Sequence, residues 1–162
     1  MKNKALLIGI VATIGVAGFL IWRQFKKLMD YKLSFRSVKI NKINAKELSL
    51  TLGLNFQNKS DIQLVLTKQK YEVSINSVLL STITNDKEVV VAPNSTTPMT
   101  FNVSVGSKGI ADLLKTMNFQ ELLNIKKQRL KVASTIDVKI GSKVKTITQT
   151  SEDIIENWSK SE

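Results

Sequence analysis

The sequence predicts a mainly β protein, an antiparallel β-sandwich with one amphipathic helix, preceded by a single transmembrane helix. Three observations lead to this prediction. Apolar and polar residues alternate with a period of two over much of the chain, which is typical of half-buried strands. Pairs of turn-forming residues separate these stretches at short intervals. A run of 18 residues without a charged side chain lies near the N-terminus.

The uncharged run extends from Ala5 to Trp22 and predicts a membrane anchor over residues 1–27. As a helix it reaches about 27 Å, close to the roughly 30 Å hydrocarbon core of a bilayer. Basic residues flank it on both sides, and Trp22 stands where interfacial aromatic residues are favoured. The alternatives are a cleaved signal peptide, because small residues occur near Val16–Gly18, and a buried core helix.

Small residues recur at every fourth position of the predicted span, at Ala5, Gly9, Thr13 and Ala17. Such a stripe lets another membrane helix approach closely, so we expect these residues to contribute to helix packing. The other interpretation is that membrane helices are generally rich in glycine and alanine.

The net charge of +11 is concentrated at the N-terminus. The first 46 residues carry ten basic and one acidic side chain, whereas the remaining 116 carry fourteen and twelve. Residues 28–46 therefore form a basic juxtamembrane stretch that also contains the first strand. We expect anionic lipid headgroups to be contacted by Arg23, Lys26, Lys27 and Lys32. A nucleic-acid partner is disfavoured, because the basic residues are not spread over a domain face among aromatic residues.

The body of the sandwich is predicted over residues 47–150. Its clearest strand runs from Leu48 to Phe56, where leucines alternate with polar residues and Gly53 suggests a bulge. Asn76-Ser77 and Gly141-Ser142 predict two-residue hairpin turns, and Ala92–Pro98 a loop. The predicted strands cover residues 31–41, 48–56, 62–75, 78–84, 89–91, 99–105, 128–140 and 143–150.

Two segments predict helices. From Ser107 to about Asn124, apolar residues recur at the spacing of an amphipathic helix. Thr150 to Asp153 reads as a capping box that opens a short helix within the C-terminal segment 151–162. Trp158 in that segment either docks on a protein partner or covers the end of the sandwich.

The order of these elements resembles the late-embryogenesis-abundant type 2 family, also called the water-stress and hypersensitive-response domain. The matching stretches are LSLTLGLNFQNKSDIQLVLTKQKYEVSINSVLL and VVVAPNSTTPMTFNVSV with the following helix, so the resemblance covers roughly residues 31–150. Asn58 matches the asparagine of the family's Asn-Pro pair, and Lys59 stands where proline is usual. The resemblance implies a fibronectin-like, non-enzymatic sandwich, often tethered by one N-terminal membrane helix. It further implies a role in desiccation protection or in binding at membranes and protein surfaces.

The residues themselves argue against catalysis. The chain has no cysteine and no histidine, which excludes thiolate zinc sites, cysteine nucleophiles and histidine general bases. Carboxylates are scattered singly along the predicted strands and turns, and no glycine-rich phosphate loop is present. We therefore expect no enzyme activity, cofactor or metal. A small-ligand site would need a pocket that the sequence does not indicate.

Two functions fit these features. The first is a single-pass membrane protein whose sandwich binds or scaffolds at an anionic membrane surface, together with other proteins of a membrane-associated assembly; a homo-oligomer is compatible with it. The alternative is a minor structural protein in the membrane of a lipid-containing bacteriophage virion, linking that membrane to the protein shell. Topology stays open, because the positive-inside rule places the sandwich in the cytoplasm and a signal-anchor would place it outside.

Overall fold

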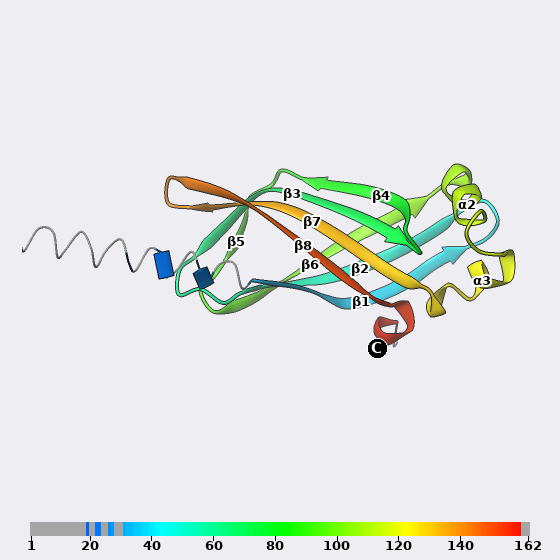
Figure 1. Ribbon diagram of the computed structural model, residues 1–162, viewed down its shortest axis with the longest axis horizontal. Helices are drawn as coiled ribbons and strands as arrows, with labels where there is room; N and C mark the ends of the chain where they lie inside the picture. The colour runs from blue at the N-terminus through cyan, green and yellow to red at the C-terminus, as the bar shows by residue number, and fades with distance from the viewer. Residues whose placement is uncertain (1–18, 20–21, 24–25, 28–30, 160–162) are drawn as a thin grey trace, which may run out of the picture.

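The structure, a computed structural model, describes residues 19, 22–23, 26–27 and 31–159. Two antiparallel sheets face each other in an elongated sandwich (Figure 1). The first sheet has the order β1 (Lys32–Ile43), β2 (Leu48–Asn58), β6 (Ser95–Val105). The second has the order β4 (Val78–Asn85), β3 (Leu64–Ile75), β7 (Arg129–Ile140), β8 (Lys143–Ile154), and β5 (Val89–Val91) also pairs with β3. The predicted mainly β sandwich is confirmed.

The core lies between the sheets and is built from the alternating side chains. On β2 the fully buried residues are Leu48, Leu50, Leu52, Leu54 and Phe56. Gly53 lies opposite a bulge rather than in one. The extra residue is Arg36 on the partner strand β1, and a Cβ at Gly53 would lie 2.4 Å from Ser37 Oγ. A glycine here therefore leaves room for the side chains of Ser37 and Arg36 at the bulge.

Side chains from β8 join the two sheets along one edge. The backbone N–H of Leu33 donates to Gln149 Oε1 at 2.7 Å, and Ser151 Oγ donates to the Leu33 carbonyl at 2.7 Å. Leu33 lies on β1, an edge strand whose outward backbone groups need partners. These bonds satisfy two of them and tie β1 to the opposite sheet.

The predicted helix over residues 107–124 is broken in two. α2 (Ser107–Leu113) and α3 (Phe119–Leu123) are separated by a turn, and the 3-10 turn η1 (Ile125–Lys127) follows. The physical reason is a second helix start: Asn118 and Glu121 form a reciprocal capping box, with bonds of 2.9 and 2.7 Å. Both helices still bury apolar residues against the sandwich.

Two other local predictions need correction. β8 continues to Ile154, because Ser151 and Glu152 pair with β7, and only the 3-10 turn η2 (Ile155–Trp158) follows. The capping-box reading at Thr150 is therefore wrong. The loop predicted to end at Pro98 ends earlier, since β6 begins at Ser95. Pro98 is tolerated there because β6 is an edge strand.

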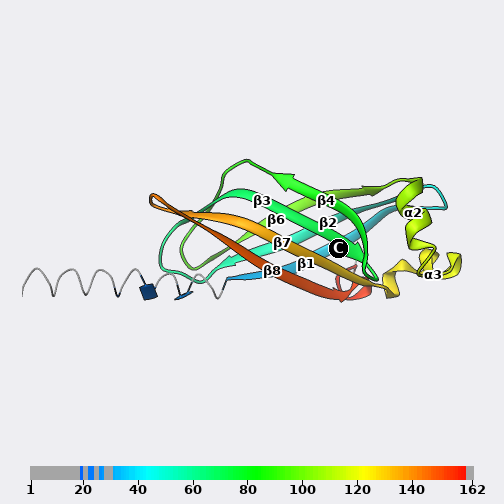
Figure 2. The same ribbon diagram turned by 45° about the horizontal axis from the view of Figure 1, so that its top comes forward.

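The two predicted hairpin turns lie at opposite ends of the second sheet. Asn76 and Ser77 have positive φ of 46° and 68°, and Gly141 has φ of 58°. We call the end that carries α2, α3, η1 and the Asn76–Ser77 turn the helical end. The N-terminal end carries loops 59–63 and 92–94 and the β7–β8 turn (Figures 1 and 2).

The predicted membrane span lies almost wholly outside the described residues. Ala5, Gly9, Thr13 and Ala17 are among those not described, so their packing role stays a prediction. In the part of the chain that the structure describes, no helix is long and apolar enough to cross a membrane.

Candidate functional site

The described part of the N-terminal segment exposes two aromatic rings beside basic side chains. Phe19 and Trp22 are each 58% exposed, and their ring centroids lie 6.1 Å apart. Lys26 Nζ lies 5.4 Å from the Trp22 ring centroid, within the range of a cation–π contact. Arg23 is also exposed. Aromatic rings next to cations are the side chains favoured at the boundary between lipid and water.

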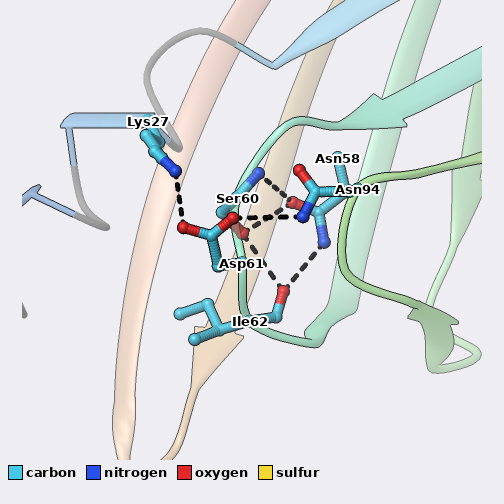
Figure 3. Close-up of polar contacts among 6 residues, drawn as sticks. All are labelled: Lys27, Asn58, Ser60, Asp61, Ile62 and Asn94. Atoms are coloured by element: carbon cyan, nitrogen blue, oxygen red, sulfur yellow. Dashed lines mark hydrogen bonds and ion pairs between the residues drawn. The ribbon is translucent and has the colours of Figure 1, made fainter.

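Lys27 connects this segment to the sandwich. Its ammonium pairs with Asp61 in the loop after β2, at 2.5 Å, and the other Asp61 oxygen accepts a bond from Asn94 Nδ2 at 3.1 Å (Figure 3). The backbone N–H of Asn94 in turn donates to the carbonyl of Ser60. Lys27 and Asp61 are both partly solvated, so the ion pair contributes at most about 1 kcal/mol. Its effect is to orient the segment against the N-terminal end.

Asn58 organises the loop that carries Asp61. It is the last residue of β2 and only 1% exposed. Its Nδ2 donates to the Ile62 carbonyl at 2.9 Å, and its Oδ1 accepts from the Ser60 backbone N–H at 2.9 Å (Figure 3). The same Nδ2 also donates to the Ala92 carbonyl at 2.9 Å. A buried amide with these partners holds loops 59–63 and 92–94 together. Lys59, where the family usually has proline, is exposed.

The predicted lipid-contact residues therefore separate into two kinds. Arg23, Lys26 and Lys32 are exposed, whereas Lys27 is half-buried and paired. Lys32 is the first residue of β1. Sequence reasoning did not assign a role to Asp61, because a single carboxylate in a turn is ordinarily a solvated surface charge. The Asn-Lys-Ser-Asp turn was its only local signal.

Trp158 covers the sandwich next to β1. The ring is half-buried and lies 6.0 Å from the Phe35 ring, and its indole N–H donates to Asp153 Oδ2 at 2.8 Å. That bond, with others from Ile154 and Asn157, holds the pKa of the Asp153 carboxyl below its usual range. These contacts favour the covering role; partner docking by Trp158 stays a prediction.

A second polar group lies inside the core and was not predicted. Tyr71 is fully buried, and its hydroxyl donates to the side-chain oxygen of Gln69 at 3.0 Å. Gln69 is itself 1% exposed and donates to the carbonyl of Lys87 at 3.3 Å. Burial raises the pKa of Tyr71 well above its usual range and also raises that of Tyr31. The sequence did not indicate the Tyr71–Gln69 hydrogen bond, because Tyr71 occupies an ordinary core position in the apolar alternation of β3.

The described carboxylates lie apart from one another. Among residues 31–159 and the few described before them, no three acidic side chains lie close enough to hold a metal ion. A shallow hollow over β3 and β7 is lined by lysines and by Asp86 and Asp137. Asp137 accepts a bond from Thr146 Oγ1 at 2.6 Å on the exposed face of the sheet. The expectation of no enzyme activity stays a prediction.

Solved structures with a similar arrangement have low sequence identity. A crystal structure of a protein from Archaeoglobus fulgidus is 19% identical, with a TM-score of 0.49, covering 74% of this chain and 94% of that one. A solution structure of a late embryogenesis abundant (LEA) candidate is 9% identical, with a TM-score of 0.48, covering 88% and 84%. For a Bacteroides uniformis β-glucuronidase the values are 10%, 0.47, 75% and 14%. With TM-scores below 0.5, these similarities say nothing about function.

The family comparison is more informative. Among curated proteins, none matches the chain. Residues 54–152, by contrast, match the sequence pattern of the LEA_2 family, described as late embryogenesis abundant protein. This region runs from within β2 to within β8 and includes Asn58, both hairpin turns and the helical segment. Because the match spans more than half of the chain, the protein belongs to the late embryogenesis abundant LEA_2 family, as the resemblance predicted.

Proposed function

We propose that this LEA_2 domain is a non-enzymatic, membrane-anchored β-sandwich that binds or scaffolds at the surface of an anionic membrane. The observation that supports it best is the exposed Phe19–Trp22 pair with Lys26 over the Trp22 ring. This group lies directly at the end of the 18-residue uncharged run. Bilayer interfaces favour the same combination of aromatic and basic side chains.

The attachment of the segment supports a defined position for the sandwich at the membrane. The Lys27–Asp61 pair and the Asn58 hydrogen bonds link the segment to two loops of the N-terminal end. The strands run along the long axis of the domain, so the helical end projects away from this end (Figure 2). The sandwich then has one end next to the lipid and the other available to protein partners. No observation among the described residues favours the bacteriophage alternative; fixed-stoichiometry co-purification with virus particles would support it.

Trp22 provides a direct test, because the chain has only two tryptophans. In Trp158→Phe, Trp22 is the single tryptophan. We expect its fluorescence to shift to the blue when the full chain is reconstituted in phosphatidylcholine–phosphatidylglycerol vesicles, and brominated lipids to quench it. The matched control is Trp22→Phe, in which Trp158 lies against Phe35 and escapes quenching. Water-like emission from Trp22 in vesicles would overturn the proposed function.

We call Arg23, Lys26 and Lys27 the basic collar, and neutralising them tests whether binding depends on the negative charge of the lipid. We expect Arg23→Gln/Lys26→Gln/Lys27→Gln to weaken transfer of the full chain from detergent to anionic vesicles about 100-fold at low salt, at about 1 kcal/mol per residue. High salt should remove most of the difference, and neutral vesicles should show little of it.

The control is Lys108→Gln/Lys126→Gln/Lys127→Gln, which removes the same charge from exposed lysines of the helical end. It should bind like the unmodified chain. Arg23→Gln/Lys26→Gln, which leaves the Lys27–Asp61 pair in place, separates the charge effect from the loss of that contact. Equal binding by collar and control variants would contradict a lipid role for these residues.

A further inference from the structure

A row of four cross-strand neighbours crosses the outer face of the second sheet at the N-terminal end. Val90 on β5 pairs with Val65 on β3, Val65 pairs with Lys139 on β7, and Lys139 pairs with Val144 on β8. Directly opposite residues of antiparallel strands point to the same face. The flanking residues Leu64, Leu66 and Val138 are fully buried, so the row itself faces outward. We call these four residues the outer row.

The outer row is unusually apolar for an exposed sheet face. Val144 is 59% exposed and Val90 55% exposed, which places both among the most exposed large apolar side chains described, with Phe19, Trp22 and Leu79. Val65 between them is half-buried. A single exposed valine is ordinary, but several aligned valines form an apolar patch, and such patches are typical of surfaces that contact a membrane or another protein.

Lysines lie beside these valines, and so do two acidic residues, Glu88 two positions before Val90 and Asp137 two positions before Lys139. Lys139 belongs to the row, and Lys143 is exposed at the β7–β8 turn. Loops 59–63 and 92–94 and residues 139–143 together contain three lysines and one acidic residue, Asp61, which pairs with Lys27. At the helical end, residues 107–127 contain four lysines and two acidic residues. Each of these two sets of residues therefore has a net charge of +2, and the N-terminal end differs in lying next to Lys26 and Lys27 rather than in carrying more positive charge.

The outer row lies at the same end as the basic collar. Asp61, the partner of Lys27, is four residues before Val65 along the chain. The β7–β8 turn and the described N-terminal residues lie at the same end of the sandwich in both views (Figures 1 and 2). A membrane that holds Trp22 at its interface is thus on the side toward which this turn points.

We infer that the outer row and the β7–β8 turn form a second membrane contact, with an anionic bilayer surface as the occupant. Lys139 and Lys143 contact lipid headgroups, and Val144 and Val90 lie against the interfacial region. At the boundary between lipid and water, lysine ammonium groups can reach the anionic headgroups while the neighbouring apolar side chains contact the lipid, as proposed for the collar. The inference rests on the proposed function, and it adds that the sandwich is held in one orientation by two contacts rather than by a flexible tether.

Site-specific labelling tests this orientation, because the chain has no cysteine. An environment-sensitive fluorophore on Ser142→Cys reports the β7–β8 turn, and one on Ser77→Cys reports the equivalent exposed turn at the helical end. With the full chain in phosphatidylcholine–phosphatidylglycerol vesicles, we expect a blue shift and quenching by brominated lipid at Ser142 only. Equal, water-like emission from both labels would overturn the inference.

Charge variants test the cause. Lys139→Gln/Lys143→Gln should lower the ratio of docked to undocked Ser142 label by about fivefold per lysine, the ratio that corresponds to about 1 kcal/mol. Lys126→Gln/Lys127→Gln is the matched control and should leave the label unchanged. An unchanged Ser142 signal in the first variant would contradict headgroup contact by these lysines.

Trp22 fluorescence in the same samples separates the two proposals. Trp22 in lipid with Ser142 in water overturns only the second contact, whereas Trp22 in water overturns the proposed function itself. A blue shift at Ser142 that depends on protein concentration and not on anionic lipid would assign the outer row to a second copy of the chain, and would also overturn the inference.

Discussion

Asn58→Ala is expected to lower the free energy of unfolding by about 1 to 3 kcal/mol. Asn58 is buried, and the substitution removes the oxygen that accepts from the Ser60 backbone N–H and from Ser60 Oγ. The carbonyls of Ile62 and Ala92 lose the Asn58 amide but keep hydrogen bonds from Ser60 Oγ and Ser95 Oγ. Each buried group that loses its only partner costs about 1 to 3 kcal/mol. Urea unfolding of the full chain in a neutral detergent measures the change.

Asn55→Ala is the matched control for this prediction. Asn55 lies on the same strand but is only partly buried. Its loss is expected to change stability by no more than about 0.5 kcal/mol. Asn58→Asp should resemble Asn58→Ala at neutral pH, because a carboxylate sets negative charge against the two carbonyl oxygens. Equal stability of the Asn58 and Asn55 variants would show that the loops are held by other contacts.

Raising the pH above about 10 is expected to destabilise the sandwich through its two tyrosines. Burial raises the pKa of both the Tyr71 and Tyr31 hydroxyls in the folded state. The unfolded chain therefore releases these protons first. The stability that neutral tyrosines provide is fully present below the unfolded pKa of about 10, and it is lost as the pH rises toward the folded values.

Tyrosinate absorbance measures this effect directly, since the chain has only these two tyrosines. In the folded protein the absorbance should appear only well above the usual pH, and it should appear together with loss of structure. Tyr71→Phe separates tyrosine ionisation from lysine deprotonation. At neutral pH it should be less stable by about 1 to 3 kcal/mol, because Gln69 loses a buried donor, and this deficit should shrink at alkaline pH. Tyrosinate formation near pH 10 in the folded state would contradict burial of both hydroxyls.

Local chemistry allowed the strands and turns to be predicted. The alternation from Leu48 to Phe56 specified which side chains face the core, and Asn76-Ser77 and Gly141-Ser142 specified hairpins. Local signals failed where tertiary contacts outweighed them. The residues from Thr150 to Asp153 belong to β8, because their backbone groups pair with β7. The predicted single helix is divided because Asn118 caps the start of a second helix.

The sequence by itself determined the family, the strand pattern, the uncharged N-terminal run and the concentration of basic residues after it. Only the tertiary structure decided which distant residues meet. Asn58 finds acceptors on Ala92, Lys27 finds Asp61, and Val90, Val65, Lys139 and Val144 align in one row. The reason is that periodicity and turn chemistry act over a few residues, whereas the register between strands is set by the packing of both sheets at once.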